Sequence, residues 1–182
     1  PDFERLHQQR AKVGPFIREL AVKMGITPVP THRIKPSFRN TNAYVDLLRR
    51  RIHIGEGLVG KLYDNELKAV IAHELAHIQR GDLYPALLKF LCNFSALMSF
   101  IMLFIFLVFT GTFIWPLLAV YGGAKLLNLL LLARSRKGEF DCDRRAAIAI
   151  GDPMALAEAL RKTIMDDPRA IKSGTSIFRT HP

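Results

Sequence analysis

The stretch that decides the fold is His73-Glu74-Leu75-Ala76-His77, at the centre of a segment whose apolar residues recur at helical spacing. Residues four positions apart on an α-helix share one face and lie about 6 Å apart along the axis. His73 and His77 can therefore converge on one metal ion. Glu74 then lies beside that ion, where its carboxylate can take a proton from an activated water. The stretch predicts a metal-binding helix that also carries a general base.

Two histidines leave a catalytic zinc site one protein ligand short, because such sites use three and keep a fourth position open. Glu139 is the best candidate for the third ligand, since it lies downstream with Asp143 four residues later on the same helical face. The Asp143 carboxylate can hold a ligating histidine in the required tautomer. Asp141, on another side of that helix, is the alternative ligand. Asp82, directly after Gly81, either contributes to the site or caps or orients the loop that follows the His73 helix. The cofactor predicted is one Zn2+ per chain.

An apolar block lies between the two halves of this site. Residues 90–109 carry no charge and match the length of about 20 residues that a helix needs to cross about 30 Å of hydrocarbon. A short polar turn at residues 110–112 leads to a second apolar stretch at residues 113–133. We expect a transmembrane hairpin. Two buried helices of a soluble core are the alternative, which the small size of the remaining chain disfavours.

Basic residues flank this block. Its connecting turn carries none, so both ends are expected on the cytoplasmic side; the flanking residues are Arg80, Lys89, Arg134, Arg136 and Lys137. The formal net charge of +10 invites a nucleic-acid-binding interpretation. However, the sequence contains no basic stripe interleaved with aromatic residues of the kind that binds single strands. We expect no nucleic acid partner, and the charge fits a solvated face or an anionic lipid surface.

The remaining segments predict an α+β fold that is mainly helical. A helix is expected over residues 2–24, with a break or kink at Gly14-Pro15. A small antiparallel sheet of about three strands is expected over residues 29–34, 42–48 and 51–54. Glycines at 55, 57 and 60 are expected to loosen the chain before the His73 helix. Asp64 caps that helix and Gly81 ends it.

Further helices are expected at residues 134–150 and 153–165, followed by a mobile loop at residues 173–176. His7, His32 and His53 stand alone in the sequence and are interpreted as ordinary surface or sheet residues. The two cysteines, at positions 92 and 142, form no disulfide framework and suggest a reducing compartment.

Taken together, these motifs resemble the HtpX-type membrane metalloproteases, which are related to the CAAX prenyl proteases. The resemblance covers the chain from about residue 41 to its end. It rests on these stretches: His73 to His77 with Arg80-Gly81-Asp82, the apolar hairpin, Ser135-Arg136, Glu139-Phe140 with Asp143, Thr41-Asn42-Ala43-Tyr44, Asp152-Pro153-Met154-Ala155-Leu156 and Phe178-Arg179-Thr180-His181-Pro182.

The resemblance implies a zincin-like metalloprotease domain with an inserted transmembrane helical hairpin. Residues 1–85 would form the first part of the catalytic domain, residues 86–133 the hairpin, and residues 134–182 the second part, with the third ligand. In this scheme Glu74 is the general base and acid, and Asp143 supports the zinc ligands, which are His73, His77 and Glu139.

By the same resemblance, a protein or peptide substrate in extended conformation adds to the sheet edge near Asn42 and Ala43. His181 would donate to the oxyanion. The protein would be a membrane-anchored zinc endopeptidase of a prokaryotic plasma membrane that faces the cytoplasm and cleaves membrane or misfolded proteins. The resemblance also implies further membrane segments and a continuation past Pro182, so we expect the chain to be part of a longer protein.

Two other functions fit some of these residues. A CAAX-type prenyl-protein protease needs an enclosing chamber of many membrane spans, which one hairpin does not build. A catalytically latent zinc-binding membrane adaptor would keep the metal but not the chemistry. The sequence does not indicate the oligomeric state or the cleavage preference.

Overall fold

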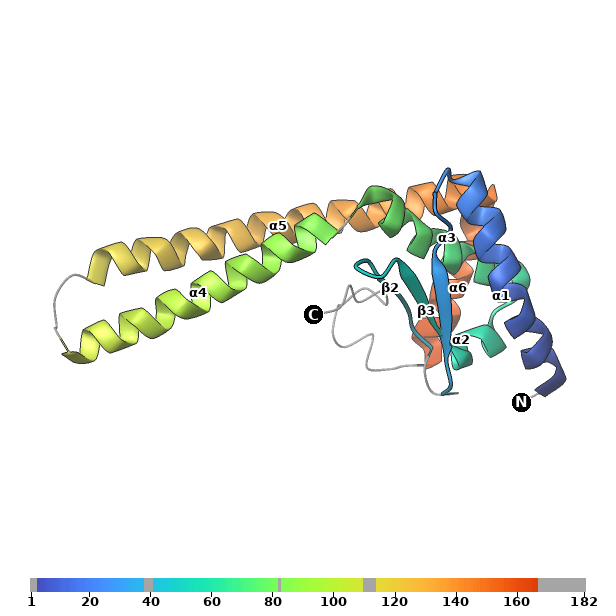
Figure 1. Ribbon diagram of the computed structural model, residues 1–182, viewed down its shortest axis with the longest axis horizontal. Helices are drawn as coiled ribbons and strands as arrows, with labels where there is room; N and C mark the ends of the chain where they lie inside the picture. Colours follow the sequence, from blue (N-terminus) through green and yellow to red (C-terminus); the bar gives the residue numbers. More distant parts are fainter. Residues whose placement is uncertain (1–2, 38–40, 82, 110–113, 167–182) are drawn as a thin grey trace. The chain divides into compact units, whose positions relative to one another are not determined.

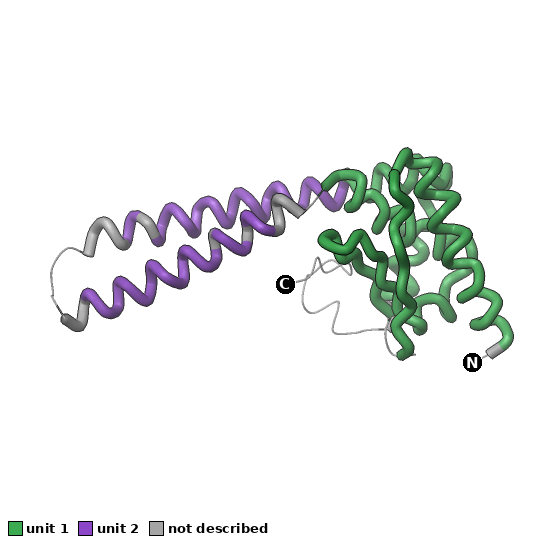
Figure 2. Tube along the Cα trace, in the orientation of Figure 1, with its two compact units in different colours: residues 1–81, 141–182 green, residues 82–140 purple. Residues whose placement is uncertain are grey.

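The computed structural model describes residues 3–37, 41–81, 83–109 and 114–166. The chain divides into two compact units (Figure 2). Unit 1 comprises residues 1–81 and 141–182, and unit 2 comprises residues 82–140. The expected α+β fold, mainly helical, is confirmed.

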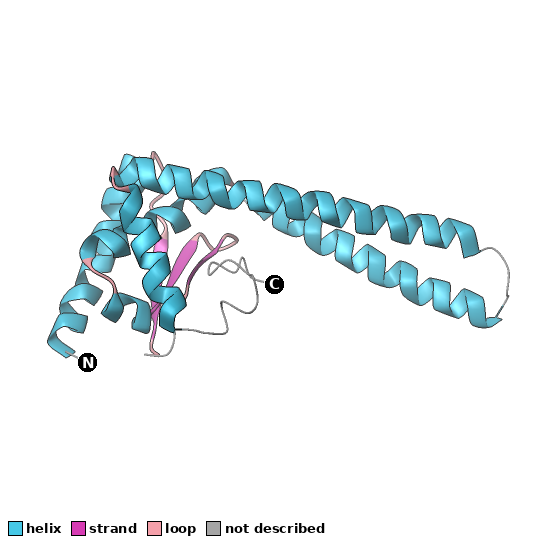
Figure 3. Ribbon diagram, turned by 180° about the vertical axis from the view of Figure 1, so that it is seen from behind, coloured by secondary structure: helices cyan, strands magenta, loops and turns pink. Residues whose placement is uncertain are grey.

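Unit 1 contains four complete helices, a three-stranded sheet and the end of a fifth helix among the described residues (Figures 1 and 3). In chain order these elements are α1 (Phe3–Lys23), β1 (Thr31–Lys35), β2 (Ala43–Asp46), β3 (Arg51–Gly55), α2 (Glu56–Lys61), α3 (Asp64–Arg80), the last part of α5 (Ile114–Ile150) and α6 (Pro153–Asp166).

The sheet is mixed, so the expectation of an antiparallel sheet is wrong. Its strand order is β1-β3-β2, with β2 antiparallel to β3 and β1 parallel to it. Strand composition predicts neither order nor direction. The segment between β1 and β2 is long enough for the two strands to lie on opposite sides of β3. Strand β1 can therefore run parallel to β3. Consequently β2 is an edge strand of the sheet that the described residues form.

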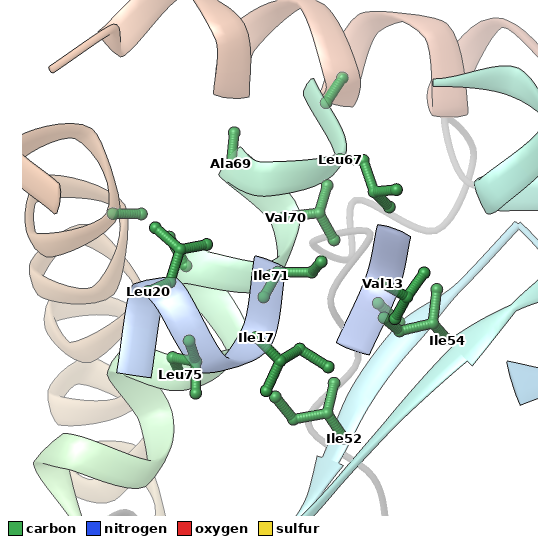
Figure 4. Packing of buried hydrophobic residues seen from close by; sticks show 14 of the residues in the cluster. Val13, Ile17, Leu20, Ile52, Ile54, Leu67, Ala69, Val70, Ile71 and Leu75 are labelled. Carbon is green, nitrogen blue, oxygen red and sulfur yellow. The ribbon is translucent and has the colours of Figure 1, made fainter. Parts of the chain in front are cut away.

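The core of unit 1 is made by faces of α1, α3 and the sheet, together with residues of α2, α6 and the end of α5. Figure 4 shows Ile17 of α1, Ile71 of α3 and Ile52 of β3 pointing toward one another, and all three are at most 1% exposed. Gly14 allows α1 to approach β1, because a Cβ at this position would lie only 3.2 Å from the His32 ring. The core therefore fixes α3 on three sides before any metal is considered.

Helix α1 continues past Pro15, so Gly14-Pro15 does not break the helix. The glycine-containing stretch after β3, expected to be loose, forms the short helix α2. Burial explains the second difference, because Leu58 and Val59 of α2 are at most 2% exposed and belong to the core. Tertiary packing overrides weak local helix preference here.

Helix α3 begins one residue earlier than predicted. Its N-cap is Tyr63, whose backbone N–H donates to the Glu66 carboxylate at 2.9 Å. Asp64, predicted as the cap, is instead the first helical residue and binds side chains of α1. Gly81 ends the helix in the left-handed conformation at φ 71°, as predicted.

Unit 2 contains α4 (Leu83–Phe109) and the first part of α5. The two helices run side by side in Figures 1 and 3, and Asn128 of α5 donates a hydrogen bond of 2.7 Å to Asn93 of α4. The second apolar stretch and the predicted helix at residues 134–150 are one continuous helix, which corrects the expectation of two. The turn at residues 110–112 lies outside the described residues. Among the residues that are described, no helix is both long and apolar enough to cross a membrane.

Candidate metal centre

Three polar side chains of α3 are buried within an otherwise apolar stretch of the helix. His73, Glu74 and His77 are 1%, 2% and 5% exposed. Leu75 and Ala76, between them, are completely buried. Burying two imidazoles and a carboxylate is costly unless they have partners. Groups on neighbouring elements are therefore expected to bind these side chains and offset the cost of burying them.

The two histidine rings converge as the i, i+4 spacing predicts. Their Nε2 atoms lie 3.2 Å apart, and the ring centroids are 4.9 Å apart at 78°. Each Nδ1 faces α5: that of His73 lies 2.8 Å from Asp143 Oδ1, and that of His77 lies 3.5 Å from Cys142 Sγ. A partner at Nδ1 leaves Nε2 as the atom available to a metal.

Glu139 of α5 supplies a carboxylate oxygen to the same group of ligands. One ligand atom each of His73, His77 and Glu139 lie within 4.8 Å of one another. Two imidazole nitrogens and one carboxylate oxygen form a donor set typical of catalytic zinc sites, which add a water or substrate at the fourth position. The residues present thus fit a zinc ion.

Asp141, the alternative third ligand, has other partners. Its carboxylate accepts from Arg145 Nε at 3.0 Å, and Arg145 Nη1 donates to Gln79 of α3 at 2.9 Å. Within the described part of the chain, the group that could hold a metal does not include Asp141. Its place on a different side of α5 directs this carboxylate to an ion pair.

The sheet residues Asn42 and Ala43 lie at the start of β2, which contacts α3. Asn42 accepts a backbone hydrogen bond of 2.9 Å from Gly55, and Ala43 is 1% exposed and pairs with Ile54. The opposite edge of β2 carries no strand among the described residues. The edge strand and the metal-binding helix are thus neighbouring elements of unit 1.

The isolated histidines His32 and His53 are sheet residues, as expected. His53 stacks on Tyr44 with ring centroids 4.7 Å apart. Burial, followed by the charge of Lys35, lowers the pKa of His53. Burial also lowers the pKa of His32. Both side chains are therefore neutral near pH 7, where they serve packing in the sheet.

Three predictions fall outside the described residues. They are the role of His181 with its motif at residues 178–182, the role of Asp82, and the loop at residues 173–176.

Cys142 is a residue of this site that sequence reasoning missed. A signal was present, because Cys142 and Asp143 follow Glu139 at positions i+3 and i+4 and so share its helical face.

Comparison with known proteins decides the family. A model of peptidase family M48 matches residues 7–182. The chain belongs to peptidase family M48. It is similar to proteins named protease HtpX homolog: 39% identical over 58% of the chain in Ralstonia nicotianae, 32% over 89% in Acaryochloris marina, and 29% over 93% in Methanopyrus kandleri. These matches cover 39%, 58% and 57% of the relatives, so the chain spans less than two thirds of their length. No solved structure matches.

Membership of M48 gives the buried group on α3 and α5 its interpretation. Such peptidases depend on a metal, and the M48 chain described here places two histidines and a carboxylate where one ion can bind. The donor set and the family membership both indicate a metal centre.

Proposed function

We propose that this chain is the catalytic part of a zinc-dependent, membrane-anchored endopeptidase that cleaves membrane or misfolded proteins. The observation that carries the proposal is the buried group of His73, His77 and Glu139 with Glu74 adjacent on α3. Membership of M48 and the likeness to protease HtpX homologs support it.

A zinc ion bound by these three ligands supplies Lewis-acid polarisation of the scissile carbonyl and of the attacking water. Glu74 takes one proton from that water as its oxygen attacks the carbonyl carbon. Glu74 then delivers the proton to the amide nitrogen, so that the C–N bond breaks and the products are a carboxylic acid and an amine. The burial of Glu74 keeps bulk water away from this transfer.

The substrate is a protein segment in extended conformation. Its main chain pairs with the edge strand β2 beginning near Asn42 and Ala43, which contacts the helix that holds the general base. Asp143 orients His73 from the ring atom opposite the metal. His181, by its motif, donates to the developing oxyanion.

Unit 2 anchors the enzyme in the bilayer. It exposes large apolar side chains on both helices, among them Phe94, Phe104 and Leu130, which are 52%, 62% and 60% exposed. Lipid removes these surfaces from water. The exposed Arg134, Arg136 and Lys137 follow the apolar part of α5 and support a cytoplasmic position for this end of the helix, at a prokaryotic plasma membrane.

The test is cleavage of an unfolded protein by the detergent-purified, zinc-loaded chain beside Glu74→Gln at equal metal content. We expect the parent to cut and Glu74→Gln to lose about 100- to 10,000-fold of the rate, the range general-base catalysis supplies. Full activity of Glu74→Gln contradicts the mechanism. Zinc binding without cleavage by either protein favours the latent adaptor.

A further inference from the structure

A fully buried thiol touches one of the two metal-binding histidines. Cys142 of α5 is 0% exposed and forms no disulfide. Its Sγ lies 3.5 Å from His77 Nδ1, a distance at which sulfur and a ring nitrogen form a hydrogen bond. Both residues belong to unit 1. Neither the family model nor the names of the relatives give this cysteine a role.

The contact has a counterpart on the other histidine. The next residue, Asp143, lies 2.8 Å from His73 Nδ1. Consecutive residues of one helix thus face the Nδ1 atoms of both histidines, while the two Nε2 atoms face each other at 3.2 Å. One turn of α5 therefore sets the orientation of both rings.

We propose that Cys142 is a positioning residue that holds the His77 ring for zinc through Nδ1, an inference that rests on the zinc site proposed above. When Nε2 gives its lone pair to a metal, a neutral imidazole carries its proton at Nδ1. In a buried site that N–H needs an acceptor, because leaving it unsatisfied costs about 1–3 kcal/mol. The Cys142 sulfur is the acceptor at this position.

The two partners differ in strength. The Asp143 carboxylate is a strong acceptor, whereas a thiol sulfur is a weak one. His73 is accordingly held firmly, and His77 more loosely. Loss of an outer partner of a metal ligand typically lowers metal affinity by 10- to 100-fold, and the thiol belongs at the lower end of this range.

The test compares zinc dissociation constants of the full chain, measured by competition with a chromogenic chelator. Cys142→Val has a similar volume but no acceptor, and we expect about 10-fold weaker zinc binding. Cys142→Ser restores a donor and acceptor and should recover most of the affinity. The matched control is Ala146→Gly, one turn later on α5, which is also 0% exposed. It should lower the melting temperature and leave zinc affinity within about twofold.

The visible spectrum of bound Co2+ gives a second readout. Its bands should shift in Cys142→Val and coincide with those of the parent in Ala146→Gly. If Cys142→Val does not fold, Cys142→Ala takes its place. Parental affinity and spectrum in the valine or alanine variant, or an equal loss in Ala146→Gly, overturn the proposal. Failure of the parent chain to bind zinc overturns the proposed function, and this inference with it.

Discussion

The two units treat apolar side chains in opposite ways. In unit 1 the helices turn their large apolar residues inward, so that Ile17, Ile71 and Leu75 are at most 1% exposed. In unit 2 the large apolar residues of α4 and α5 are largely exposed, and Ala96 is a rare buried residue. Unit 1 has a core that excludes water, whereas the described part of unit 2 exposes an apolar surface whose contact with water is unfavourable.

The same contrast applies to polar groups. Unit 1 buries His73, Glu74 and His77, and Asp143 and Cys142 of α5 lie beside the rings of the two histidines. In unit 2 the inter-helix hydrogen bond between Asn128 and Asn93 lies at exposed residues. An apolar residue therefore indicates a core only where other elements cover it, and the three polar residues buried together on α3 mark the candidate metal centre. The predictions below test this contrast.

The largest effect is expected from truncating an apolar residue in each unit. Ile71→Ala should lower the free energy of unfolding by about 2–5 kcal/mol, because the core of unit 1 does not refill the cavity. Leu130→Ala, at a position 60% exposed on α5, should change it by less than about 0.5 kcal/mol. Denaturant unfolding of the detergent-solubilised protein measures both. Equal losses of unfolding free energy in the two variants would contradict the difference between the two units.

A charge placed on the exposed apolar surface of unit 2 should weaken membrane association. Phe104→Lys puts an ammonium at a position 62% exposed on α4, at a cost of about 3 kcal/mol in hydrocarbon. Its control, Val22→Lys, places the same charge at a residue 70% exposed on α1 of unit 1. Alkaline extraction of membranes should release more of the Phe104 variant than of the control. Identical release would show that α4 does not contact lipid.

The smallest effect is expected from the partly buried polar link between α1 and α3. Hydrogen bonds from Lys12, at 2.8 Å, and Gln9, at 2.6 Å, lower the pKa of Asp64. Because the folded-state pKa lies below the unfolded value of about 3.9, the stabilisation is complete above that value and disappears as pH falls through the folded pKa.

Asp64→Asn should therefore cost about 0.2–1 kcal/mol at pH 7, the range of exposed ion pairs, and nothing at the acidic end. Unfolding free energies at pH 7 and at a pH below the folded-state pKa of Asp64 measure the difference between variant and parent. A gap that persists at low pH would show that Asp64 acts through packing instead of charge.

The sequence predicted helices α1, α3 and α6, the stop at Gly81 and the convergence of His73 and His77, because each depends on contacts within a few residues. It did not predict the parallel pairing of β1 with β3, since neither strand order nor direction leaves a local pattern. Helix α2 was missed because burial of Leu58 and Val59 outweighs its glycines.

At the site, helical spacing was sufficient to select Glu139 and Asp143 but did not identify the partner of each ring. That assignment depends on how α5 packs against α3, which brings Asp143 to His73 and Cys142 to His77. The sequence could not eliminate Asp141 as the third ligand. In the structure Asp141 pairs with Arg145, which also donates to Gln79 of α3, and this second contact depends on how the two helices pack.

The most direct test of the metal centre is the zinc content of three purified proteins, the parent, Glu139→Gln and Asp141→Asn, after dialysis against a mild chelator. The two carboxylates lie two residues apart on α5. Among the described residues, the group that could hold a metal ion with both histidines contains Glu139 and not Asp141. We expect one zinc per chain in the parent and in Asp141→Asn, and little in Glu139→Gln. Full zinc content in Glu139→Gln, or its loss in Asp141→Asn, would contradict the site described here.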